Sequence, residues 1–233
     1  MSECCNPSAY RRFFNQKEAQ KHLRKYQRKG IDGMTRSLLD YMTSRGMEGR
    51  SVLEAGGGIG AVQIELLRAG AASAVNVELS AGYEGIASEL LEREGFTGRV
   101  QRRIGDFTEL AGNLEADDVV MNRVICCYPF MERLMNTAMS SSSRFVAAVF
   151  PRDHLGSRFM VATGNTFCRT RGVDFRASSI PQTRSSRRRS ERGSMLLSMT
   201  VTSSGTPSYS RSGRRKASGN NEVPTDPRAH RHF

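Results

Sequence analysis

Apolar and polar residues follow two alternating patterns between residues 51 and 151. Short apolar runs recur at intervals of about 20 to 30 residues, and most of them end in a glycine or an acidic residue. Between these runs, apolar residues return every three or four positions. The short runs predict buried β-strands, and the longer spacing predicts amphipathic helices between them.

The expected strands lie, in chain order, in SVLEAG, AVNVELS, VQRRIGDF, ADDVVMNRVICCYP and RFVAAVFP. The expected helices between them are GAVQIELLRAG, GYEGIASELLEREG and FMERLMNTAMSSSS. Regular alternation of strands and helices without a hairpin signal is typical of a parallel sheet with helices on both faces. We therefore predict an α/β fold with a doubly wound, mostly parallel sheet.

The two ends of the chain differ from this middle part. Residues 1–46 predict basic helices, the first ended by Gly30 and the second, GMTRSLLDYMTSRG, ended by Gly46. The periodicity stops near residue 176, and residues 177–233 are rich in Ser and Arg. Such a composition buries too little apolar surface to fold, so we expect a disordered tail in which only MLLSMTV could form a strand. The remaining part, residues 47–176, is the expected domain.

Charge follows the same division. The net charge of +12 comprises +6 in residues 1–50, −5 in residues 51–150 and +11 in residues 151–233. Nucleic-acid contact is therefore expected only through the basic tail.

The five cysteines include two adjacent pairs without C-x-x-C spacing. No signal peptide is recognisable, and no apolar run is long enough to cross a membrane. We expect a cytoplasmic protein with reduced thiols, no metal site and no membrane contact.

The stretch LEAGGGIG places four glycines between positions 56 and 60, directly after the first strand. In a doubly wound sheet the ligand binds at this turn, and glycines let it approach the backbone closely. Gly56, Gly58 and Ala61 match the dinucleotide fingerprint G-x-G-x-x-G/A, and Glu78 stands about where that fingerprint has its ribose-binding acid. Glu54, by contrast, suits a cationic ligand better than a pyrophosphate. The glycine-rich stretch by itself therefore leaves two ligand classes possible, a dinucleotide and a cationic ligand.

The same stretch resembles the E/D-x-G-x-G-x-G motif of the class I S-adenosylmethionine (SAM) dependent methyltransferases. Later segments are similar to that family as well: VNVELS, IGDF and DDVVMNRVICCYP follow in the family's order. The resemblance implies that Glu54 faces the ammonium end of SAM, that Glu78 binds the ribose hydroxyls, and that Asp106 and Phe107 contact the adenine. The cofactor-binding residues that it implies are Glu54, Gly56, Gly58, Gly60, Glu78, Leu79, Asp106, Phe107 and Asn122.

Methyl transfer from a sulfonium is an in-line displacement, and alignment of the acceptor supplies most of the acceleration. The strand-four exit, residues 122–128, and the segment FPRDH after strand five are expected near the methyl group. Arg123, Tyr128 and His154 are the candidate catalytic residues, and Cys126 and Cys127 lie beside them.

Within the family, the chain is loosely similar to small-molecule methyltransferases of the magnesium-protoporphyrin type. The family usually completes its sheet with two more strands, and the sequence apparently lacks them. The resemblance also implies that the basic N-terminal segment covers the cofactor as a lid. The expected function is methylation of a small-molecule acceptor. A nicotinamide-dependent oxidoreductase and a nucleic-acid-binding protein with a retained cofactor fold are the alternatives.

Overall fold

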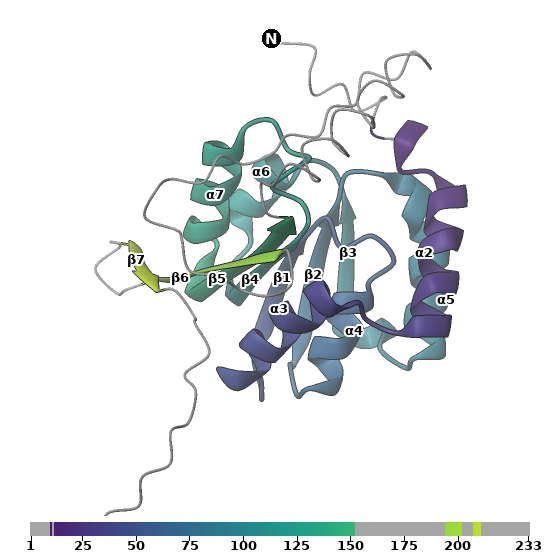
Figure 1. The fold of residues 1–233 in the computed structure, drawn as a ribbon, viewed down its shortest axis with the longest axis horizontal. Coiled ribbons are helices and arrows are strands. Elements are labelled where there is room, and N and C mark those ends of the chain that lie inside the picture. The colour runs from purple at the N-terminus through teal and green to yellow at the C-terminus, as the bar shows by residue number, and fades with distance from the viewer. Residues whose placement is uncertain (1–9, 11, 152–193, 202–206, 211–233) are drawn as a thin grey trace, which may run out of the picture.

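The computed structural model describes residues 10, 12–151, 194–201 and 207–210, and the side chains of residues 10 and 12–150. The described strands form one seven-stranded sheet in the order β3-β2-β1-β4-β5-β6-β7 (Figure 1). Their bounds are β1 Ser51–Ala55, β2 Ser73–Glu78, β3 Val100–Ile104, β4 Ala116–Asn122, β5 Ser142–Pro151, β6 Ser194–Val201 and β7 Pro207–Ser210. All five predicted strands are present.

The first five strands are parallel, which confirms the predicted fold class. The strand β1 lies between β2 and β4, so the chain runs outward to β3 on one side and to β5 on the other. The crevice for a ligand in such a sheet lies at the carboxyl ends of the strands where the strand order reverses. That point falls at the end of β1, directly before the four glycines.

The expectation that the sheet lacks its last strands is wrong. The strand β6 pairs antiparallel with β5, and β7 pairs antiparallel with β6. The run MLLSMTV, the only strand candidate expected in the tail, forms most of β6. The short strand β7 has the sequence PSYS, which carries no apolar alternation, and its pairing depends on backbone hydrogen bonds to β6. The rest of the expected disordered tail lies outside the described residues.

The predicted helices are present as well. The helices are α2 Gln16–Lys29, α3 Gly33–Ser44, α4 Ala61–Arg68, α5 Glu84–Arg93, α6 Phe107–Leu110 and α7 Met131–Ser140. The Asn15 side chain caps α2 at its start, and Gly30, with a φ of 63°, ends it as expected. The Asp32 side chain then caps α3 by accepting from the backbone N–H groups of Met34 and Thr35.

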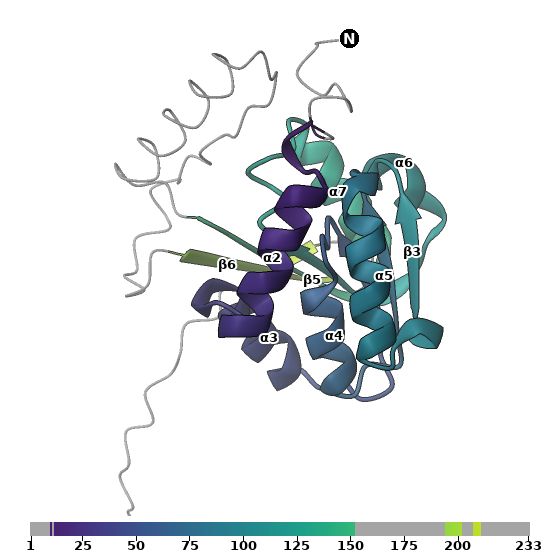
Figure 2. The same cartoon turned by 90° about the vertical axis from the view of Figure 1, so that its right-hand side faces the viewer.

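The helices form one layer on each face of the sheet (Figures 1 and 2). On one face, residues of α3 and α4 share a buried cluster with Val52 of β1 and Val120 of β4. On the other face, residues of α6 and α7 pack against Leu53 and Val119. The helix α2 lies outside this framework and packs beside α5 (Figure 2), where Ala19 of α2 is fully buried. In the described part of the chain, no helix is both long and apolar enough to span a membrane.

Candidate cofactor-binding site

The glycine loop, residues 56–60, joins β1 to α4. Gly56 and Gly58 have φ values of 63° and 55°, which side chains rarely adopt. A Cβ on Gly57 would overlap the side-chain nitrogen of Asn76 and would stand 2.5 Å from Oε2 of Glu54. The loop therefore needs glycine for two separate reasons, backbone conformation and close contact with the side chains beneath it.

Glu78, the last residue of β2, holds the loop from the side. Its Oε2 accepts from the backbone N–H of Gly58 at 3.0 Å, and its Oε1 accepts from the N–H of Ser80 at 3.0 Å. The residue is 8% exposed, and burial raises the pKa of its carboxyl while these two N–H groups and Arg102 act in the opposite direction. Glu78 thus presents a partly shielded carboxylate at the strand end.

Asp106 and Phe107 follow β3 and begin α6. Oδ1 of Asp106 caps this short helix by accepting from the Thr108 N–H at 2.7 Å. The Tyr128 hydroxyl donates to the same carboxylate, at 2.9 Å from Oδ1 and 3.0 Å from Oδ2. Asp106 therefore connects the end of β3 with the segment that follows β4.

The exit segment, residues 122–128, forms the opposite wall. The Asn122 amide donates to the Thr35 hydroxyl at 3.2 Å, and Arg123 donates to Asp32 Oδ1 at 2.5 Å. Among the residues that the structure describes, Arg123 alone has a side chain together with a positive φ, of 62°. Such a backbone costs on the order of 1 kcal/mol and persists where surrounding contacts hold it.

Cys126 and Cys127 also belong to this wall and line the cavity. Their sulfur atoms are 3.6 Å apart, and the Cys126 thiol donates to the carbonyl of Arg123. The carbonyl of Cys127 accepts from the hydroxyl of Tyr10, which joins the exit segment to the N-terminal part of the chain. The exit segment is thus held both by residues of the N-terminal part and, through Tyr128, by Asp106.

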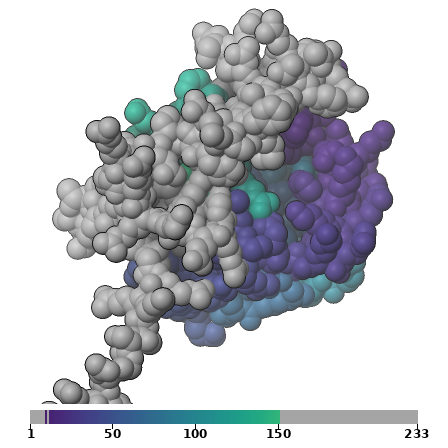
Figure 3. All heavy atoms as spheres, in the orientation of Figure 1, coloured from purple at the N-terminus to yellow at the C-terminus, as the bar shows by residue number. Residues whose placement is uncertain are grey.

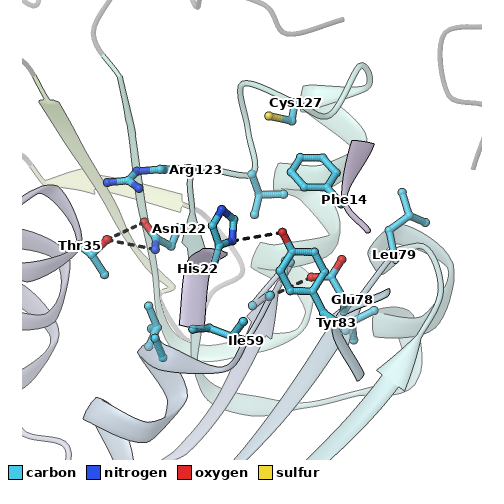
Figure 4. A pocket seen from close by; sticks show the side chains of 18 of the residues that line it. Phe14, His22, Thr35, Ile59, Glu78, Leu79, Tyr83, Asn122, Arg123 and Cys127 are labelled. Atoms are coloured by element: carbon cyan, nitrogen blue, oxygen red, sulfur yellow. Dashed lines mark hydrogen bonds between the residues drawn. The ribbon is translucent and has the colours of Figure 1, made fainter. Parts of the chain in front are cut away.

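These walls enclose a cavity of about 550 Å³. Figure 4 shows Glu78, Leu79 and Tyr83 on one side, Thr35, Asn122 and Arg123 on the other, and His22 between them. Nine residues predicted from the sequence line the cavity: Gly56, Gly58, Glu78, Leu79, Asp106, Phe107, Asn122, Arg123 and Tyr128. The structure therefore brings together side chains from four strand ends and from the N-terminal helices.

Two predicted cofactor residues do not line the cavity. Gly60 begins α4 in the left-handed conformation, with a φ of 85°. Glu54 is 1% exposed and lies beneath the glycine loop, because alternation along β1 directs it to the same face as Val52, toward Gln63 of α4 and Asn76 of β2. Glu54 is thus not exposed to the cavity, and its expected contact with the ammonium end of SAM stays a prediction. The catalytic candidate His154 lies outside the described residues.

Burial controls the chemistry of two of these groups. It raises the pKa of Glu54 to about 7, against the opposing effects of Gln63, Arg102 and Asn76. It also raises the pKa of Tyr128 to about 12, with the Asp106 carboxylate acting in the same direction. Tyr128 is therefore protonated at neutral pH and can donate a hydrogen bond, but it cannot act there as a base.

Several lining residues carried no signal in the sequence. Tyr10, Phe14 and His22 come from the N-terminal part, and the hydroxyl of Tyr83 lies 3.2 Å from Nδ1 of His22. Burial lowers the pKa of His22, which favours its neutral form. The N-terminal segment was expected to act as a lid. Which residues of α2 reach the cavity could not be predicted, because that depends on how the helix packs against α5.

No protein-family model matches the chain, and no curated protein sequence matches it. Solved structures do resemble it. The magnesium protoporphyrin IX methyltransferase of Synechocystis with bound SAH has a TM-score of 0.63 at 19% identity, covering 83% of this chain and 98% of that one. The same enzyme with bound SAM has a TM-score of 0.54 at 19% identity over 66% and 80% of the two chains. The DhpI–SAH complex has a TM-score of 0.51 at 18% identity over 64% and 70%.

The chain has the class I methyltransferase fold. This methyltransferase fold brings the glycine loop, Glu78 and Asp106 to one edge of the sheet, in the order in which they occur along the chain. That arrangement is the one expected from the resemblance of the LEAGGGIG, VNVELS and IGDF segments.

Proposed function

We propose that the protein binds SAM in the cavity and transfers its methyl group to a small-molecule acceptor. One observation carries the proposal. The glycine loop, the Glu78 carboxylate and the Asp106 carboxylate line one cavity at the carboxyl ends of β1, β2 and β3. Neighbouring folds that contain SAM or SAH support this choice of cofactor.

The residues present suit such a ligand. The two oxygens of Glu78 can accept from two vicinal ribose hydroxyls, and Asp106 can accept from an exocyclic amine. Phe107 provides an apolar surface for a purine, and the bare backbone of Gly56 and Gly58 permits close approach. Glu54 does not line the cavity, and its contact with the ammonium end of SAM stays a prediction.

When bound, SAM supplies an electrophilic methyl group on a sulfonium. The protein's part is to hold the acceptor in line with that methyl group and to exclude water. Asn122 and Arg123 lie on the wall opposite Glu78 (Figure 4), and Tyr128 lines the same cavity, so these three residues are our candidates for orienting the acceptor. His154 stays a predicted catalytic residue.

The acceptor side also carries positive charge. Lys25 and Arg123 line the cavity, and α2, which is part of the purple surface in Figure 3, contains further Lys and Arg residues. A negatively charged acceptor therefore fits this wall better than a cationic one. A cavity of about 550 Å³ has the size of a small-molecule site.

Calorimetry with SAH and NADH tests the cofactor. We expect micromolar SAH binding and no NADH binding, and the reverse result would favour the oxidoreductase alternative.

SAM with a labelled methyl group, incubated with the protein and fractionated lysate, then tests the acceptor. Label in small molecules supports the proposal, whereas label in RNA or DNA, lost on nuclease treatment, would contradict it. A cytoplasmic location stays a prediction.

A further inference from the structure

Gly58 is held by two side chains of opposite charge. Its N–H donates to the carboxylate of Glu78 at 3.0 Å, and its carbonyl accepts from Nη2 of Arg102 at 3.0 Å. Both polar backbone groups of this glycine are thus satisfied from neighbouring strands, β2 and β3. Without such contacts, a glycine-rich turn has more conformational freedom than any other kind of backbone.

Arg102 is itself oriented by an ion pair. Its Nε donates to Oε1 of Glu84, the first residue of α5, at 2.8 Å, and its Nη2 lies 2.7 Å from the same oxygen. The Arg102 side chain is 7% exposed, whereas that of Glu84 is 32% exposed. A guanidinium fork held at one end by a carboxylate has little freedom left, so its contact with Gly58 is directional.

The strand register explains why Arg102 reaches the underside of the loop. Asn76 of β2 is paired with Glu54 of β1 on one side and with Arg102 of β3 on the other. The three side chains therefore lie side by side on one face of the sheet, beneath the glycine loop. Buried atoms without a hydrogen-bond partner in this described layer are Glu54 Oε2, both amide atoms of Gln63 and Asn76, and Arg102 Nη1.

Burying this much polarity is costly, and a strand that served only the core would carry apolar residues here. The charged groups that face Arg102 come from three elements: Glu54 on β1, Glu78 on β2 and Glu84 on α5. Arg102 lowers the pKa of Glu54 and of Glu78, opposing the effect of burial on both. The cation thus helps to keep the ligand-facing carboxylate of Glu78 ionised.

We propose that Arg102 is a positioning residue for the cofactor site, which clamps Gly58 from below the glycine loop. It does not line the cavity, so it acts through the loop rather than on the ligand. A loop already held in its bound shape loses less freedom when the ligand binds, which raises affinity. The affinity part of the inference rests on SAM being the cofactor.

The first test compares Arg102→Met, Arg102→Lys and Arg103→Met. Arg103 is a matched control because it is the next residue of β3, points to the other face and donates a long hydrogen bond of 3.4 Å to Gln101 rather than to the glycine loop. We expect SAH affinity, measured by calorimetry, to fall at least tenfold in Arg102→Met and by a smaller factor in Arg102→Lys, with no change in Arg103→Met. Equal affinity in all variants would overturn the proposal.

The pH dependence separates positioning from general loss of stability. Without Arg102, the pKa of Glu78 rises further, so SAH affinity should decline at a higher pH in Arg102→Met than in the unchanged protein as the solution is acidified. Glu84→Gln should give an intermediate affinity, because the guanidinium loses its orienting partner but keeps its charge. A lower thermal midpoint with unchanged affinity and pH profile would show a merely structural role.

Hydrogen exchange of the unliganded protein tests the clamp independently of the proposed function. Amides of residues 56–60 should exchange faster in Arg102→Met than in Arg103→Met. If the unchanged protein fails to bind SAH, the proposed cofactor is wrong, but faster exchange confined to the loop would still support the clamp. Unchanged exchange in the loop would refute it.

Discussion

The two walls of the cavity are built in different ways. Glu78, on the wall with the glycine loop, bonds to Ser80 two residues away and to Gly58 twenty residues away. On the exit wall, Asn122 bonds to Thr35 across 87 residues, Arg123 to Asp32 across 91 and Tyr10 to Cys127 across 117. The loop wall can form once β1, β2 and β3 pair, whereas the exit wall also needs the N-terminal helices in place.

This difference has a consequence for mutations. The Glu78 contacts on the loop wall join a buried carboxylate to backbone groups, so changes there should weaken ligand binding strongly. On the exit wall, the Arg123–Asp32 ion pair joins partly exposed side chains, so changes to this pair should alter the acceptor's alignment with modest effects on stability. The predictions below test that contrast.

The largest effect is expected for Gly57→Ala. The added Cβ would overlap the Asn76 amide and stand 2.5 Å from Glu54 Oε2, both of which are buried and packed. We expect SAH binding to be lost and the free energy of unfolding to fall by about 1–3 kcal/mol. Gly85→Ala on α5 is the matched control, because a Cβ there meets nothing within 4 Å. Calorimetry and urea unfolding measure the two effects, and wild-type affinity in Gly57→Ala would mean that the loop is adaptable.

Glu78→Ala comes next. The change removes the carboxylate that accepts from the Gly58 N–H and that offers two oxygens to the ribose. SAH affinity should therefore fall about a hundredfold, which corresponds to the loss of one or two charge-assisted hydrogen bonds. Glu92→Ala on the exposed face of α5 should leave the affinity unchanged. If the two variants bound SAH equally well, the loop wall would not be the cofactor side.

Glu54→Gln should change the pH dependence of stability. Burial raises the folded-state pKa from 4.5 to about 7, so between these pH values the folded state holds a proton that the unfolded state has lost. Stability contributed by the protonated carboxyl is therefore present below pH 4.5 and is lost as the pH rises to about 7.

Because glutamine does not titrate, the variant should gain about 3 kcal/mol relative to the unchanged protein between about pH 4.5 and pH 8. Urea unfolding at both pH values measures the gain, with exposed Glu89→Gln as the control. If the difference in the free energy of unfolding between the two proteins stayed constant with pH, the pKa of Glu54 would not be raised in the folded state.

The smallest effect on stability is expected for Arg123→Ala. Its ion pair with Asp32 joins side chains that are 39% and 30% exposed, so its loss should cost less than about 1 kcal/mol. SAH affinity should stay within about threefold, while turnover at saturating SAM should fall about tenfold, because the acceptor loses an aligning group. Exposed Arg133→Ala is the control. A loss of SAH affinity as large as that of Glu78→Ala would remove the distinction between the walls.

Much of the fold could be predicted because its signals are local. Four of the five parallel strands contain a short apolar run, and Gly30 ends its helix where a left-handed residue is needed. The strand β7 could not be predicted, because PSYS pairs through its backbone and carries no periodic pattern. The pairing of β6 beside β5 likewise depends on a contact between segments far apart in the chain.

The sequence by itself determined the residues that end the strands. The four glycines, Glu78 and Asp106 follow apolar runs, and parallel strands bring their carboxyl ends to one edge, so these residues had to meet. Only the tertiary structure decided that Glu54 lies beneath the loop, that Arg102 clamps Gly58, and that Asp32 and Thr35 complete the far wall. The physical reason is that local patterns set the period and the ends of an element, whereas the partner of a side chain depends on register and on helix docking.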